Sequence, residues 1–287
     1  MPESEQKTSK TGTSRRRFLG GTVAAAVGLG VASAGSGIGI GEVMAQTEGS
    51  GVDEPLGWTP VDTEEIARKA RENYYAGMHC AEGVAHTLIQ AQRDLGSNRW
   101  DEVPSIVAWW GAGGGASNGV LCGTITGACS VTALAYGRSG TTMKIVNELH
   151  QRYQQTRFPQ YQPPADDDTG MTLELASNRS KSPLCHVSVT EWCDTNGYAS
   201  GSDERAERCS RVAGETAAHA IELLNAEHAG NFDMVADSTD PMTVDGEKGC
   251  RSCHYKGDNA AAGQYTRGKM ECMQCHGGAP HMPSSLK

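Results

Sequence analysis

The sequence has few long hydrophobic runs, no excess of basic charge and little of the alternation that marks β-strands. Beyond residues 19–40, no segment approaches the roughly 20 apolar residues that a membrane-spanning helix requires. With 25 Lys and Arg against 34 Asp and Glu, the formal net charge is −9, which argues against nucleic acid as a partner. Apolar residues between 61 and 230 recur at helical spacing, so an all-α fold is expected.

The first 45 residues have the pattern of an export signal. Three arginines from Arg15 to Arg17 precede a weakly apolar run rich in Gly and Ala, and a small-residue cleavage site ends at Ala45. This pattern predicts a twin-arginine signal peptide at residues 1–45 and a periplasmic mature protein without stable membrane insertion. An uncleaved anchor at residues 19–40 is disfavoured because many glycines interrupt it.

Two Cys-x-x-Cys pairs near the C-terminus are each followed directly by a histidine. They are Cys250 and Cys253 with His254, and Cys272 and Cys275 with His276. By spacing alone, four such thiolates suit a zinc ribbon. A zinc ribbon has no use for the histidines, whereas covalent haem requires two thiols for thioethers and the next residue to bind iron. We therefore predict two haem c groups, with His254 and His276 as proximal ligands.

The segment 231–287 is predicted to be a small, irregular dihaem domain. It has too few large apolar side chains to build a core, so two porphyrins would have to supply that core. Because His254 and His276 are close in sequence, their haems are expected to be neighbours that act as one redox unit.

The candidate for a distal haem ligand is His281. Five residues of chain reach at most about 17 Å, barely enough to pass from His276 around a porphyrin edge to the opposite face. His281 is therefore expected to serve the other haem or a haem of another subunit. Methionines are the alternative distal ligands, and they would raise the haem potential. They are Met242, Met270, Met273 and Met282.

Residues 61–230 are predicted to form a helical domain, preceded by a linker at 46–60. A capping-box pattern at Asp62 and Glu65 marks the first helix start. The pattern predicts helices over 62–75, 80–95, 143–158 and 206–230, and a solvated connector over 160–168. The Gly-rich run at 111–115 follows no predicted strand, so nucleotide binding is disfavoured and close approach of two backbones, or of a cofactor, is expected.

Six further cysteines lie in the helical domain. They are Cys80, Cys122, Cys129, Cys185, Cys193 and Cys209. An even number in an oxidising compartment suggests three disulfides, and thiolate binding of an iron–sulfur centre is the alternative. Twin-arginine export favours the iron–sulfur centre, because a cluster inserted in the cytoplasm requires folding before export. A buried thiol that packs as a small hydrophobe is a third reading, in particular for Cys209.

At these cysteines the sequence resembles a known family. The segments 78–84, 111–127 and 209–213, together with Cys185, look like a redox family whose signature is C, GCxxG, C, C. With the segment 185–193 and the double haem motif, residues 61–287 are similar to split-Soret cytochrome c. The resemblance implies a homodimer with two closely stacked haems per subunit, each iron held by two histidines, one of them from across the dimer.

The resemblance also implies an iron–sulfur centre in the helical domain, which we expect to be of the [2Fe–2S] type. The implied ligands are Cys80, Cys122, Cys185 and Cys209, with Cys193 as the alternate. Cys129 departs from the pattern and is expected to be a packed thiol, since on a continuous helix it would lie about 10 Å along the axis from Cys122. His79 and His186 are neighbouring alternatives.

Two functions follow from these predictions. The first is electron transfer with redox proteins as donor and acceptor, since haems with both axial positions filled offer no open site for substrate. The alternative is an enzyme that reduces a small nitrogen or sulfur species at an open haem or at the cluster.

Overall fold

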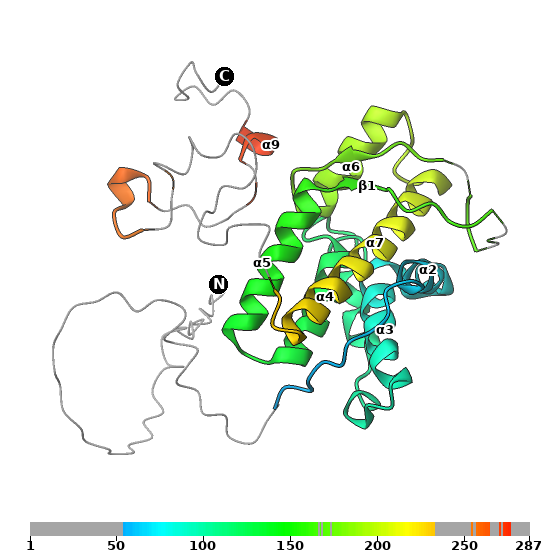
Figure 1. Ribbon diagram of the computed structural model, residues 1–287. Coiled ribbons are helices and arrows are strands. Elements are labelled where there is room, and N and C mark those ends of the chain that lie inside the picture. The colour runs from blue at the N-terminus through cyan, green and yellow to red at the C-terminus, as the bar shows by residue number, and fades with distance from the viewer. Residues whose placement is uncertain are drawn as a thin grey trace, which may run out of the picture. The chain divides into compact units, whose positions relative to one another are not determined.

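The computed structural model describes residues 54–165, 167, 169–172, 174–232, 254, 257–264, 270 and 272–276. The predicted signal peptide and the candidate haem residues Cys250, Cys253 and His281 lie outside these ranges. The described chain is mostly helical, as predicted (Figure 1). One short antiparallel pair joins β1, Arg157–Phe158, to β2, Asn178–Arg179. None of the described helices is long and apolar enough to cross a membrane.

The main helices of the body are α2 Ile66–Asn73, α3 His79–Asp94, α4 Gly123–Tyr136, α5 Gly140–Gln155, α6 Cys185–Asn196 and α7 Asp203–His228. Shorter elements are a π-helical turn, Tyr74–Met78, and the 3-10 helices η2, Asn98–Trp100, and η3, Ser105–Gly111. The C-terminal segment contains a 3-10 turn at Ala260–Ala262 and α9 at Met273–His276.

Helix α7 is central to the core, because it packs against α2, α3, α4 and α5 (Figure 1). Leu88 of α3, Ile125 of α4 and Ile221 of α7 are fully buried. Burying each such side chain stabilises the fold by about 1.5–3 kcal/mol. The body therefore has a hydrophobic core made from its own side chains.

The packed body extends into the segment predicted as a linker. Trp58 is only 5% exposed, and its ring lies edge-on to Trp100 with 6.3 Å between centroids. Its indole nitrogen donates to the Asn225 side chain at 3.0 Å, as a buried indole N–H requires. Residues 54–60 thus pack on the helical body.

The first helix begins later than the capping-box pattern predicts. Helix α2 starts after Glu65, and the carboxylate of Asp62 accepts from the Glu64 amide at 3.0 Å, which makes a turn before the helix. The predicted break before Cys80 is a π-helical turn in which Gly77 adopts φ +93°, a conformation natural to glycine. Cys80 therefore lies in the first turn of α3.

The connector predicted to be solvated is instead tied to the body. Asp167 accepts from Arg71 at 2.7 Å, and the backbone amides of Gln160 and Tyr161 donate to Glu215 at 2.7 and 3.0 Å. Arg71 is fully buried, and a buried guanidinium requires anionic partners. Charge pairing, which apolar periodicity does not reveal, explains the difference.

Candidate metal centre

The Gly-rich segment 111–119 folds into a loop that brings two parts of the backbone together. Gly113, Gly114 and Gly115 have φ values of +63°, +74° and +86°. A Cβ at Gly114 would lie 2.7 Å from the Cβ of Cys185, so no side chain fits there. Close backbone approach, one of the two predicted roles of these glycines, is therefore confirmed.

Two of the candidate ligands meet at the start of α4. Cys122 is the residue directly before this helix, and its sulfur lies 3.3 Å from the Thr124 hydroxyl. A Cβ at Gly123 would lie 2.4 Å from the sulfur of Cys80, so the glycine gives that sulfur its space. The adjacent residues Cys122 and Gly123 thus combine a thiol with the room that a second thiol needs.

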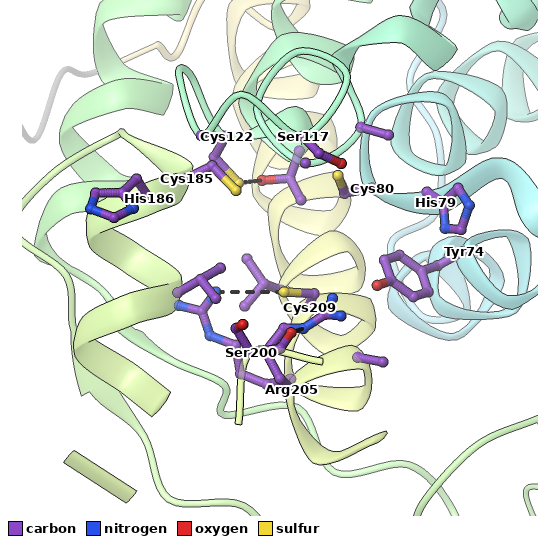
Figure 2. A pocket seen from close by; sticks show the side chains of 18 of the residues that line it. Tyr74, His79, Cys80, Ser117, Cys122, Cys185, His186, Ser200, Arg205 and Cys209 are labelled. Atoms are coloured by element: carbon purple, nitrogen blue, oxygen red, sulfur yellow. Dashed lines mark hydrogen bonds between the residues drawn. The ribbon is translucent and has the colours of Figure 1, made fainter. Parts of the chain in front are cut away.

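The third candidate ligand is the first residue of α6. The Cys185 amide donates to the Val120 carbonyl at 2.6 Å, and the Cys122 amide donates to the Pro183 carbonyl at 2.9 Å. These backbone bonds hold the starts of α4 and α6 side by side. As a result, Cys122 and Cys185 point to the same region (Figure 2).

The fourth candidate, Cys209, comes from α7 and faces the other three across a cavity of about 820 Å³ (Figure 2). All four predicted ligands line this cavity, although they are far apart in sequence. Cys193 is 6% exposed and lies outside the lining, and Cys129 packs against the hydrophobic core as predicted. The fold therefore separates these two cysteines from the set of four.

The arrangement of the thiols limits what the cavity can hold. All described cysteines are free, which contradicts the alternative of three disulfides. Within the described ranges, no three His, Cys, Asp or Glu side chains are close enough to hold a single metal ion. Four thiols spread around a cavity suit a centre of several atoms better than one ion.

Burial controls the protonation of these thiols. Burial, with a smaller contribution from neighbouring Cys122, raises the pKa of Cys80 to about 12, although the Gly113 amide acts in the opposite direction. Burial also raises the pKa of Cys185, and Cys122 again adds to the effect. Cys80 and Cys185 are therefore neutral thiols at pH 7, and metal binding there would release protons.

Two histidines adjacent in sequence to the cysteines also line the cavity (Figure 2). The His79 ring lies edge-on to Tyr74 at 5.8 Å, and His79 has a positive φ of 55°. One ring nitrogen of His186 lies 3.5 Å from the Thr190 hydroxyl. Both histidines therefore remain alternative metal ligands beside the four cysteines.

Sequence reasoning missed two arginines of the site. Arg205 and Arg208 both line the cavity, and a guanidinium nitrogen of Arg208 lies 4.0 Å from the sulfur of Cys209. Arg208 also donates to the Ser188 hydroxyl at 2.8 Å. Arg208 and Cys209 are neighbours in sequence on the helix predicted over 206–230, and this closeness of a basic residue to a candidate ligand is the signal that could have revealed the pairing.

The second haem motif lies partly within a helical turn. The amides of Cys275 and His276 donate to the Cys272 carbonyl at 3.1 and 3.0 Å. Residues three apart in such a turn share one side, which suits two thioethers to one porphyrin. Cys275 and His276 are exposed, and Cys272 and His254 are half-buried.

Comparisons with known proteins agree with these features. Residues 78–223 match the family model described as "Putative redox-active protein (C_GCAxxG_C_C)". The chain is 31% identical over 226 residues to the split-Soret cytochrome c of Desulfovibrio desulfuricans, covering 78% of each protein. The solved structure of that cytochrome from strain ATCC 27774, described as holding a novel iron centre, matches with a TM-score of 0.70 and 26% identity over 82% of this chain and 96% of its own. By sequence and by fold, this chain therefore belongs to the split-Soret cytochrome c family of redox proteins.

Proposed function

We propose that this chain is a periplasmic dihaem c-type cytochrome that transfers electrons between two closely spaced haems and an iron–sulfur centre. The main observation behind this proposal is that four cysteines line one cavity, in a chain that also contains two Cys-x-x-Cys-His motifs. These cysteines are Cys80, Cys122, Cys185 and Cys209. The iron centre of the split-Soret relative supports the same assignment.

The residues around the cavity fit an iron–sulfur centre. The four thiols come from α3, α6, α7 and the residue that precedes α4, so four separate helices supply the proposed ligands. Gly114 and Gly123 leave space that a Cβ would fill. Cysteine thiols that form no disulfide are the donor set that iron–sulfur centres use, and these four are buried or half-buried. We propose the [2Fe–2S] type for this centre, held by the four cysteines that line the cavity rather than by Cys193.

The C-terminal motifs fit covalent haem in the same chemical sense. Cys272, Cys275 and His276 follow one another in a single turn, with the two thiols on one side. We assign Cys250 and Cys253 to the first haem, with His254 as its proximal ligand. The bound haems supply one-electron carriers, and this chain's residues hold and orient them.

Assembly and location complete the proposal. We propose a homodimer in which His281 of one subunit binds a haem iron of the other, because His281 is five residues from His276 and can hardly reach the far face of the same haem. The twin-arginine pattern before residue 46 supports export to the periplasm. Redox proteins are then the partners on both sides of the electron-transfer step.

The four-cysteine assignment is tested by replacing one ligand. Cys122→Ser should abolish the non-haem iron and its paramagnetic signal while both haems remain, because serine is a poor ligand for iron–sulfur centres. Anaerobically purified protein is assayed for haem and for non-haem iron per chain. Cys129→Ser, a cysteine of the core outside the cavity, is the matched control and should keep both cofactors. Unchanged non-haem iron in Cys122→Ser would reject this ligand set.

The assignment of His281 is tested with carbon monoxide. Reduced wild-type protein should not bind it, because both axial positions of each haem are filled. His281→Ala should open one haem per chain and give the absorption change of a carbon monoxide complex. His228→Ala, an exposed histidine at the end of α7, is the control. Carbon monoxide binding by the wild type would instead favour the alternative of an enzyme with an open haem.

A further inference from the structure

The cavity of the candidate metal centre has an unusual charge for this protein. The chain carries 34 acidic residues, yet none of the described residues that line the cavity is Asp or Glu. Arg205 and Arg208 both line it, and neither belongs to an ion pair with a carboxylate in the described part of the chain. The cavity is thus a cationic site within an acidic protein, and it favours anionic occupants.

Arg208 carries the strongest sign of a missing partner. Its side chain is only 1% exposed, and its buried Nε atom has no hydrogen-bond partner among the residues that the structure describes. The nearby carboxylate of Glu215 already accepts from the backbone amides of Gln160 and Tyr161. A buried guanidinium with an unused N–H is costly unless an acceptor occupies the space beside it.

Arg205 is held in place on the same side of the cavity. Its Nε atom donates to the Ser200 carbonyl, which fixes the plane of the guanidinium. Figure 2 shows Arg205 and Ser200 on the side of Cys209, away from Cys122 and Cys185, with the Tyr74 hydroxyl pointing toward the same space.

The thiolates of an iron centre would use only part of this donor capacity. Each arginine has five N–H groups in a planar fork, which matches the geometry of an oxyanion. The hydrogen bonds described above use Ser188, Ser200 and the sulfur of Cys209 as acceptors. A cavity of about 820 Å³ is within the size range of small-molecule sites and much larger than a cluster core.

We propose that the side of the cavity around Cys209 binds a small inorganic oxyanion, with Arg205 and Arg208 as cationic donors and the Tyr74 hydroxyl as a further donor. The inference rests on the proposed function in one respect, namely that the anion lies beside an iron centre. The binding itself depends only on the arginines, the tyrosine and the space between them.

The test uses the oxidised, full-length holoprotein after anaerobic purification. Sodium sulfite and sodium nitrite are titrated separately by calorimetry. The Mössbauer spectrum of the non-haem iron, in protein enriched with ⁵⁷Fe, and the haem absorption are recorded on the same samples. We expect one anion bound per chain, a shifted iron signal and an unchanged haem spectrum. Arg205→Gln should weaken binding about tenfold or more, and Arg205→Lys should recover part of it.

Arg99→Gln is the matched control, because Arg99 is exposed and donates to the backbone carbonyls of Glu54 and Pro55, away from the cavity lining. No binding of either anion to the wild type, or equal binding to wild type and Arg205→Gln, would overturn the inference. A haem absorption change that persists in Arg205→Gln would overturn it too, since the anion would then bind at haem. If the wild-type protein and Arg205→Gln both contain no non-haem iron, weaker anion binding by Arg205→Gln would support the oxyanion site while rejecting the iron centre.

Discussion

The helical body and the C-terminal segment solve the problem of holding a cofactor in opposite ways. Residues 54–232 bury a core of Leu, Ile, Val, Ala and Trp and place four cysteines around a cavity. Of the residues in 254–276 whose exposure the structure describes, none is buried. The first region shapes a site with its own side chains, whereas the second has little apolar surface to bury and relies on the proposed haems for a core.

The two regions differ in how far apart their proposed ligands lie in the sequence. In the C-terminal segment, ligands are adjacent in sequence, so a single turn such as Cys272–His276 brings them together. In the body, Cys80 and Cys209 meet only because α3 and α7 pack against each other. Loss of a haem from the C-terminal segment should therefore leave the fold and the non-haem iron of the body unchanged.

The largest expected effect is the loss of one haem from the C-terminal segment with no change in the body. Replacing both Cys272 and Cys275 by alanine should reduce haem from two to one per chain, because no thioether can form at that motif. Non-haem iron and the helical circular dichroism of the body should stay at wild-type levels. Intact mass spectrometry and iron analysis measure the outcome. Gln274→Ala, which keeps the motif, is the control, and a parallel loss of non-haem iron would show that the regions depend on each other.

A substitution in the core of the body should lower stability without changing haem content. Leu88→Ala removes a fully buried side chain of α3 and should lower the free energy of unfolding by about 2–5 kcal/mol. Haem content should not change, because the haem motifs do not use this core. Urea unfolding followed by circular dichroism gives the energy. Leu95→Ala, at a 52% exposed position, should change it by less than about 0.5 kcal/mol; equal losses would contradict the assigned core.

The smallest effect is a pH dependence confined to the body. Burial raises the pKa of Glu215 from 4.5 to about 7, although the amides of Tyr161 and Gln160 oppose the shift. The folded protein therefore binds this proton more tightly than the unfolded chain. The stabilisation is complete below pH 4.5 and is lost as the pH rises to about 7.

Glu215→Gln should remove this dependence, because the amide stays neutral at every pH. In the wild type, this group makes the unfolding free energy fall as the pH rises between these values. In Glu215→Gln that fall should be shallower, by roughly 1.4 kcal/mol per pH unit at most. Thermal or urea unfolding across the pH range provides the measurement. Glu64→Gln, at an exposed carboxylate, controls for net charge. An unchanged slope in Glu215→Gln would show that other groups cause any pH dependence.

Particular residues show how far prediction from sequence reached. The helix predicted over 80–95 is α3, His79–Asp94, because its apolar positions repeat at a regular spacing and Gly77 precedes it. The helix predicted over 206–230 begins earlier, at Asp203, since Ser202 accepts a hydrogen bond from the Arg205 amide and caps it. Helix α6 was not predicted, because its mixture of polar and apolar residues has no clear amphipathic period.

The sequence by itself determined the haem motifs, the helical class and the family, because adjacent ligands and regular spacing are local properties of the chain. The tertiary structure alone decided that Cys80, Cys122, Cys185 and Cys209 share a cavity while Cys129 and Cys193 stay outside its lining. It also decided that Arg205 and Arg208 line that cavity without carboxylate partners in the described part of the chain. Helix packing and charge burial join residues far apart in sequence, and such long-range contacts leave no periodic trace in the chain.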